Sequence, residues 1–312
     1  LTEKPIGQTV AAGRRLVDRA ATASTKVGVV FQNRYNPSSV AIRALLDSGA
    51  LGPIAGARAA VWWYRNPAYY AAAPWRGRWE TAGGGVLINQ AIHTLDLLTW
   101  FLGHPASVRG RAATLALADA IEVEDIASIV IDHDTGVRST FFATNCHHTN
   151  ADIELEITGR DGVVKLTGGE VWQTDAAGTR QIASDSQATG ERSYWGKGHG
   201  LLIDDFYARL DDPEPFWIGP ADGLAPLRVL REVYAPLIEA GVLQRAALLE
   251  ATRQTAQNGT AVVVCSAEVE DLAAICDRVL VLQDGVVAHE LTAPLTPEAI
   301  LHATFTPMGG AA

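Results

Sequence analysis

The sequence predicts an α+β protein in which helices pack against a broad, mostly antiparallel sheet. Residues 106–183 read as successive strand-like runs joined by tight turns. Residues 85–102, just before them, carry the apolar spacing of a helix. Mixed helix and strand patterns come before and after this region. A partial α/β segment at the beginning of the chain and a short α/β tail are therefore expected as well.

The first 66 residues alternate between helical and strand patterns. Helical spacing of apolar residues is found over 9–25 and again over 38–49, where serines can cap the start. "KVGVVFQNRY" (26–35) is a short apolar run of strand type, and "GPIAGARAAVWWYRN" (52–66) predicts a second strand. This rhythm is typical of an α/β segment.

The strand-rich region carries clear turn signals. "DHDTG" (132–136) and "GRDG" (159–162) supply the Asp and Gly that short turns require. Alternation in "IASIVI" and "IELEI" indicates strands with one covered face and one more polar face. We therefore expect a sheet domain over 52–185 with the helix of 85–102 packed on it.

The remaining chain returns to helical spacing and then alternates once more. Beyond about residue 236 the pattern again resembles an α/β segment. The expected elements are helices at 198–212, 221–235, 244–257, 267–276 and 297–304, and strands at 260–266, 277–283 and 286–291.

Bulk composition excludes several classes of protein. The chain has 312 residues, of which 48% are hydrophobic and 19% charged, so a globular, two-domain protein is expected. Its net charge of −10 argues against a nucleic-acid partner. No apolar run approaches the ~20 residues that span a bilayer, so no membrane insertion is expected. Three cysteines fit neither a disulfide framework nor a zinc site, which predicts a cytoplasmic protein without a metal.

The stretch "GGGVLINQAIHTLDLLTWFLG" (83–103) combines three glycines with a polar row, Asn89, His93 and Asp96. Asn89 and His93 are four residues apart and share a helix face. A histidine with a pKa near neutrality can take a proton from a hydroxyl. Gly83–Gly85 lack Cβ atoms, so a ligand or cofactor ring could approach their backbone. The alternative is a packed core helix, which periodicity alone does not exclude.

Two other stretches are candidates for chemistry. Lys4 precedes a proline, which favours an extended backbone that can point the ammonium into a cleft; a solvated surface lysine is the alternative. The segment 62–80 is rich in aromatic and arginine residues that could stack on sugar faces and hold polar groups. The alternative for this segment is a loop that packs its own aromatics. The residues concerned are Tyr64, Arg65, Tyr69, Trp75, Arg76, Arg78 and Trp79.

Several stretches together resemble successive signatures of the Gfo/Idh/MocA family (glucose–fructose oxidoreductase, inositol dehydrogenase, rhizopine catabolism). The resemblance runs from residue 1 to about 235. It implies an N-terminal Rossmann domain that binds NAD or NADP and a C-terminal α+β domain that holds a sugar or cyclitol. The stretches are "TEKPIGQTVAAGRRLVDRA", "VGVVFQNRYNPSSVAIRALLDSGALGPI", "YYAAAPWRGRWETAGGGVLINQAIHTLDLLTWFLG" and "GHGLLIDDFYARL".

The resemblance also implies roles for single residues. Lys4 is expected near the nicotinamide and the substrate hydroxyl, and His93 as the acid/base residue. Asn89, which stands where many members carry Asp, is expected to hold the substrate oxygen; the "NQAIH" form is similar to nucleotide-sugar dehydrogenases. We assign substrate contacts to Arg34, Tyr64, Trp75, Arg76 and Gln90, and cofactor contacts to Lys4, Pro5, Gln32 and Arg34. A homo-oligomer through the sheet face is the implied assembly.

No G-x-G-x-x-G phosphate turn occurs in the sequence, and in the family it should precede Lys4. Residues 1–50 are therefore predicted as a remnant of the Rossmann domain, and 51–235 as the substrate and oligomerisation domain. Residues 236–312 resemble the end of an ATP-binding subunit of a sugar ABC transporter, without its Walker A loop.

The predicted function is that of a truncated NAD(P)-dependent oxidoreductase that binds its cofactor weakly. The alternatives are a non-catalytic remnant or oligomerisation module and, third, an ABC-type ATP-binding subunit.

Overall fold

The computed structural model describes residues 1–7, 9–185, 197–259, 261–264, 269–283 and 286–306, without the side chains of 238–248, 250 and 251. Contacts between residues divide the chain into two compact units, Leu1–Leu237 and Ile238–Ala312. Residues 1–50 thus belong to the same compact unit as the sheet. The three-way division expected from the sequence stays a prediction.

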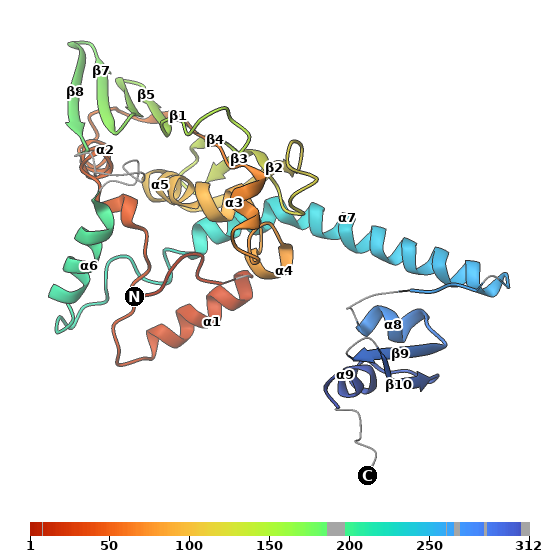
Figure 1. Ribbon diagram of the computed structural model, residues 1–312. Helices are drawn as coiled ribbons and strands as arrows, with labels where there is room; N and C mark the ends of the chain where they lie inside the picture. Colours follow the sequence, from red (N-terminus) through yellow and green to blue (C-terminus); the bar gives the residue numbers. More distant parts are fainter. Residues whose placement is uncertain (8, 186–196, 260, 265–268, 284–285, 307–312) are drawn as a thin grey trace. The chain divides into compact units, whose positions relative to one another are not determined.

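The first unit is organised around one eight-stranded sheet (Figure 1). The strand order is β2-β3-β4-β1-β5-β6-β7-β8, and every neighbouring pair is antiparallel except β1 and β4, which run parallel. The expected large, mostly antiparallel sheet is confirmed. Its strands are β1 Ile54–Trp62, β2 Pro105–Ala113, β3 Ile126–His133, β4 Arg138–Thr144, β5 Glu154–Gly159, β6 Gly162–Thr167, β7 Glu170–Asp175 and β8 Gly178–Ser184.

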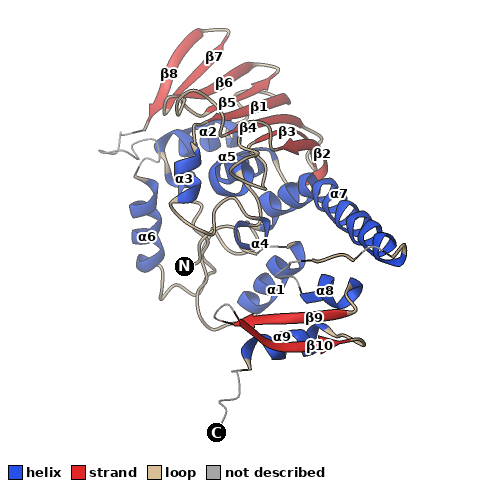
Figure 2. Ribbon diagram, turned by 45° about the vertical axis from the view of Figure 1, so that its right-hand side comes forward, coloured by secondary structure: helices blue, strands red, loops and turns tan. Residues whose placement is uncertain are grey.

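Helices cover one face of this sheet (Figure 2). α2 Pro37–Asp47 contacts β7 and β8, and α5 Ile92–Leu102 contacts β1. The alternation along β3 follows from this arrangement: Ala127, Ile129 and Ile131 are buried, whereas Ser128 between them is exposed. The period-two pattern therefore predicted correctly that one face is covered and one is left more polar.

The beginning of the chain agrees with the sequence only in part. α1 Val10–Ala21 forms where helical spacing predicted it. The strand predicted over 26–35 is wrong: Val29 makes only an isolated bridge to Thr2, and Gln32–Tyr35 form the 3₁₀ helix η1. The apolar run is a buried core segment, and its N–H groups bind carbonyls outside any strand, as Val29 does with Ile218. A short apolar run does not distinguish these cases.

The glycine-rich stretch, for which the sequence predicted a helix over 85–102, begins as a π-helix and continues as an α-helix. α3 Pro67–Ala71 and α4 Trp79–Ala82 lie ahead of it in the chain, and α4 ends at Gly83 in the left-handed conformation. Leu87–Ala91 form a π-helix, η2, which leads directly into α5. π-helical turns recur at functional sites.

The helices after the sheet differ from the prediction in one respect. α6 Gly198–Ala208 forms as expected. α7 Leu224–Gln257 is one continuous helix with Pro236 inside it, where two helices, 221–235 and 244–257, were expected. Residues 237–257 are rich in Ala, Leu, Glu, Gln and Arg, whose high helix propensity continues the helix past the proline.

The second unit is small. Its elements are α8 Val269–Ile275, β9 Arg278–Gln283, β10 Val286–Thr292 and α9 Pro297–Phe305, with β9 and β10 antiparallel. The strand predicted over 260–266 is wrong for 261–264, which are in no strand; residues 260, 265 and 266 lie outside the described part. In the part of the chain that the structure describes, no helix is both long and apolar enough to cross a membrane.

Candidate active site

Lys4 lies against η2, the π-helix that leads into α5. Its Nζ donates to the carbonyl oxygens of Asn89, at 2.9 Å, and of Ile88, at 3.4 Å. Burial lowers the pKa of the Lys4 ammonium from 10.5 to about 8, against the opposing charge of Glu3. The sequence left open whether Lys4 is a surface residue; the structure places it inward, on the segment that carries Asn89 and His93.

His93 is half-buried at the start of α5, with the ring of Phe31 edge-on at 6.2 Å between centroids. Its Nδ1 is buried and has no hydrogen-bond partner among the described residues. Burial, followed by the charges of Lys4 and His199, lowers the pKa of the imidazole well below its usual range. The ring is therefore neutral near pH 7 and can accept a proton. The nearby His199 was missed as a site residue, although it stands in the "GHG" stretch.

Asp96, the third member of the polar row, has a different part. The carboxylate of Asp96 binds Nε and Nη2 of Arg34 at 2.9 and 2.7 Å, and Asp222 binds Nη1 at 2.8 Å. Arg34 and Asp96 are only 3% and 0% exposed, so this is a buried ion pair. Arg34 was predicted to contact substrate and cofactor; the structure instead has all three nitrogens bound to carboxylates. Asp96 thus fits the alternative of a packed core helix, because it forms a buried ion pair. His93 differs, because its Nδ1 has no partner among the described residues.

The glycines serve the packing of the protein itself. A Cβ on Gly85 would lie 1.8 Å from the backbone oxygen of Glu124. A Cβ on Gly84, whose φ is +153°, would lie 2.4 Å from the hydroxyl of Tyr234. The interpretation that these glycines admit a ligand or cofactor ring is wrong for Gly84 and Gly85, because protein atoms already occupy that space.

Glu124 was missed by sequence reasoning. Its carboxylate accepts the N–H groups of Gly85 at 2.7 Å and Leu87 at 3.0 Å, and the hydroxyl of Tyr234 at 2.8 Å. Burial raises the pKa of Glu124 from 4.5 to about 7, although these bonds oppose the rise. Glu124 therefore anchors the start of η2, and through it the segment that presents Asn89 and His93. The run of glycines in the sequence indicated that some other group approaches this backbone closely, but it did not identify that group as Glu124.

The other predicted residues form a second group. Gln90 is buried; its amide donates to the hydroxyl of Tyr69 at 3.2 Å and its oxygen accepts from Asn145 at 3.2 Å. The guanidinium carbon of Arg76 lies 4.2 Å from the centroid of the Tyr69 ring. Tyr64 and Trp75 are exposed, Pro5 is half-buried, and Gln32 is buried with an unpartnered side-chain oxygen.

The described residues fit only part of a dinucleotide. The neutral imidazole of His93 and the ammonium of Lys4 suit a nicotinamide ring and a substrate hydroxyl beside them. A glycine-rich strand–turn–helix that would cradle the pyrophosphate is absent from the described ranges. The described residues could therefore contact the nicotinamide ring of the cofactor but not its pyrophosphate.

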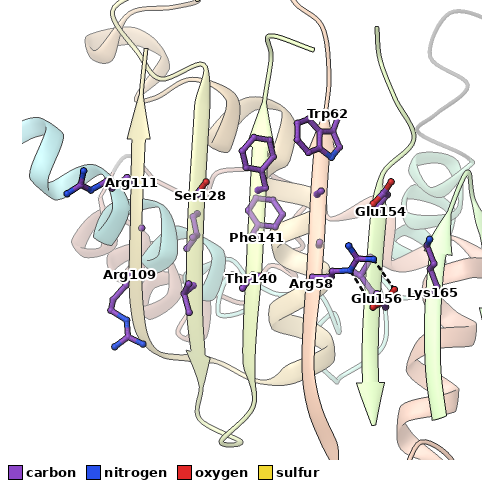
Figure 3. A pocket seen from close by; sticks show the side chains of 17 residues that line it. Arg58, Trp62, Arg109, Arg111, Ser128, Thr140, Phe141, Glu154, Glu156 and Lys165 are labelled. Atoms are coloured by element: carbon purple, nitrogen blue, oxygen red, sulfur yellow. Dashed lines mark hydrogen bonds and ion pairs between the residues drawn. The ribbon is translucent and has the colours of Figure 1, made fainter. Parts of the chain in front are cut away.

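The sheet face opposite the helices carries a pocket of about 750 Å³ (Figure 3). The rings of Trp62 on β1 and Phe142 on β4 pack against each other within it, with centroids 4.3 Å apart and planes tilted by 35°. Arg111 on β2 lies at one side and Glu154 on β5 at the other, and neither forms an ion pair with a described residue. The aromatic rings thus lie between Arg111 on β2 and a group of mixed charge on the other side, in which Arg58 pairs with Glu156 and Lys165 follows on β6.

Comparison with known proteins agrees with this architecture. Residues 39–165 match the GFO/IDH/MocA C-terminal domain. The chain is 25% identical to a D-apiose dehydrogenase of Rhizobium rhizogenes, over 54% of this chain and 48% of that protein. It is 28% identical to an inositol 2-dehydrogenase of Paracoccus denitrificans, over 53% of this chain and 46% of that protein. The chain thus spans about half the length of these relatives.

Solved structures show the same fold. The WlbA dehydrogenase from Bordetella pertussis, in complex with NADH and UDP-GlcNAcA, superposes with a TM-score of 0.64 at 28% identity, covering 76% of this chain and 70% of that one. An oxidoreductase from Agrobacterium radiobacter, in complex with NAD+, L-tartaric acid and magnesium, gives a TM-score of 0.66 at 20% identity, covering 75% and 69%. The latter supports the fold alone.

Proposed function

We propose that this chain is the substrate-binding part of an NAD(P)-dependent oxidoreductase of the Gfo/Idh/MocA family, acting on a hydroxyl of a sugar, cyclitol or nucleotide sugar. One observation carries the proposal: a half-buried, neutral His93 lies close to the ammonium of Lys4. A neutral base beside a cation is the arrangement that oxidation of an alcohol requires. The similarity to sugar and cyclitol dehydrogenases supports it.

The proposed roles follow from these positions. The imidazole of His93 takes the hydroxyl proton, and the ammonium of Lys4 stabilises the negative charge that develops on the oxygen. The side-chain amide of Asn89 holds that oxygen in place. A bound nicotinamide would accept the hydride, with Lys4, Pro5 and Gln32 as the residues of this chain beside it.

Joining a family Rossmann domain ahead of Leu1 tests the assignment. We expect dehydrogenase activity, and His93→Ala should lower the turnover at least about a hundredfold, the usual effect of a positioned acid/base group. His104→Ala is the matched control, because His104 is exposed. A His93→Ala chimera with wild-type turnover would refute the proposed role.

We further propose that the 312 residues alone bind NADH weakly, because the sequence contains no glycine-rich phosphate turn. A fluorescence titration measures this, and micromolar affinity would contradict it. The cytoplasmic location stays a prediction, and no observation on the described residues favours an ATP-binding function for the second unit.

The second candidate function, an oligomerisation module, draws on the open sheet face. Arg111 on β2 and Glu154 on β5 lie on either side of the Trp62 and Phe142 rings. A two-fold axis along the strands would bring the β2 side of one copy onto the β5 side of another. We expect a dimer or tetramer in light scattering. Arg111→Glu should weaken it and Arg111→Glu with Glu154→Arg should restore it, whereas a folded, strictly monomeric wild type would refute the idea.

A further inference from the structure

Two arginines lie against one aromatic ring in the segment that follows β1. The guanidinium carbons of Arg65 and Arg76 lie 5.1 and 4.2 Å from the centroid of Tyr69. Each also contacts a tryptophan ring, Trp63 at 5.3 Å and Trp75 at 5.4 Å. Aromatic faces hold a guanidinium without consuming its N–H donors, which stay available for a ligand.

Neither arginine forms an ion pair with a described residue. Arg65 donates only to the backbone oxygen of Tyr64, at 2.6 Å, and to Oδ1 of Asn150, at 2.8 Å. Nη1 of Arg76 donates to the backbone oxygen of Tyr69 at 2.9 Å, while its buried Nε has no partner among the described residues. Both arginines are half-buried residues, and an unpaired half-buried cation favours an anion beside it.

Arg78 shows the contrast. It lies only two residues from Arg76 and forms an ion pair with Glu122. In the described structure, Arg65 and Arg76 therefore differ from a neighbouring arginine of the same segment in having no carboxylate partner.

The two arginines are connected to the candidate active site. The hydroxyl of Tyr69, whose ring both arginines contact, accepts a hydrogen bond from Gln90, three residues before His93. Gln90 in turn accepts from Asn145, which is fully buried and whose own side-chain oxygen has no partner. The ring of Tyr69 and its hydrogen bond to Gln90 thus connect the two arginines to the segment that carries His93.

We propose that Arg65 and Arg76 bind an anionic group of the substrate, a carboxylate or a phosphate, beside the ring of Tyr69. This inference rests on the proposed function and narrows its substrate to an acidic or phosphorylated sugar. The planar guanidinium matches both groups by paired hydrogen bonds. The exposed faces of Tyr64 and Trp75 are available to pack on the sugar ring.

Calorimetry on the 312-residue chain tests the proposal without any cofactor. The probes are D-glucuronate, which carries a carboxylate, glucose 6-phosphate, which carries a phosphate, and neutral D-glucose. We expect at least one anionic probe to bind about tenfold more tightly than glucose at low salt, with the difference shrinking as salt is added. The stronger of the two identifies the anionic group.

Arg65→Gln and Arg76→Gln should each weaken the anionic probe about 10- to 100-fold, as expected for the loss of charge-assisted hydrogen bonds. Arg78→Gln is the matched control and should leave the affinity unchanged. Equal affinities for all three probes, binding of neither anionic probe at millimolar concentration, or unchanged affinity in both variants would overturn the proposal.

The chimera with a family Rossmann domain separates this inference from the proposed function. Oxidation of neutral sugars with no preference for acidic ones would retain the oxidoreductase function and overturn the anion site. Binding of an anionic probe that depends on Arg76, with no dehydrogenase activity, would retain the anion site and overturn the oxidoreductase function.

Discussion

Replacing Gly85 by alanine tests whether the glycine run serves the protein or a ligand. The backbone of Gly85 is outside the positive-φ region, so alanine brings no conformational strain of its own. The new Cβ would, however, lie 1.8 Å from the backbone oxygen of Glu124. That oxygen would have to retreat by roughly 1.5 Å to reach van der Waals distance.

The expected loss can be estimated from the bonds at risk. The movement would disturb the bonds of Gly85 and Leu87 to the Glu124 carboxylate, and that of Val86 to its backbone oxygen at 3.1 Å. Bonds to Glu124 contribute about 1.5–3 kcal/mol each when its carboxyl group is ionised and about 1 kcal/mol each when it is neutral, and the bond of Val86 contributes about 1 kcal/mol. With partial relaxation, we expect the free energy of unfolding to fall by about 3–5 kcal/mol, in the range of severe core changes.

Urea unfolding, followed by tryptophan fluorescence, measures this loss. Gly200→Ala in α6 is the matched control: Gly200 is exposed, nothing lies within 4 Å of the added Cβ, and its φ is also outside the positive region. Alanine there should be neutral or stabilise by at most about 1 kcal/mol. Unchanged stability in Gly85→Ala, together with weakened NADH or sugar binding, would show that the glycine makes room for a ligand and would refute the packing argument.

Two further predictions concern buried charges. The pKa of Glu124 is about 7 in the folded protein and 4.5 in its ordinary state, so the free energy of unfolding should fall by about 3 kcal/mol as the pH rises from below 4.5 to above 7. Glu124→Gln should reduce the difference in unfolding free energy between pH 5 and pH 8. An unchanged difference in this variant would contradict the prediction. Arg34→Met leaves Asp96 buried without its partner and should cost about 3–5 kcal/mol. Arg160→Met, at the exposed pair with Asp161, should leave the urea midpoint unchanged, and equal losses in the two variants would contradict the role of burial.

Much of the site could be read from local sequence, but not all of it. The four-residue spacing of Asn89 and His93 and the run "EKP" marked Lys4 and His93 only as candidates, and the resemblance to the Gfo/Idh/MocA family implied their catalytic roles. Neither spacing nor residue type could separate His93 from Asp96. That separation depends on Arg34, 62 residues from Asp96, which binds one carboxylate and leaves the imidazole unpartnered.

The sequence by itself determined the elements whose periodicity is long and regular: the strands of the sheet, its covered and open faces, and the helices α1, α2 and α6. Only the tertiary structure decided that the run around Val29 is no strand, that Glu124 occupies the space beside Gly85, and that Arg34 holds the core. The physical reason is that periodicity reports which side of an element is buried, whereas the identity of the atoms that meet there depends on residues far apart in the chain.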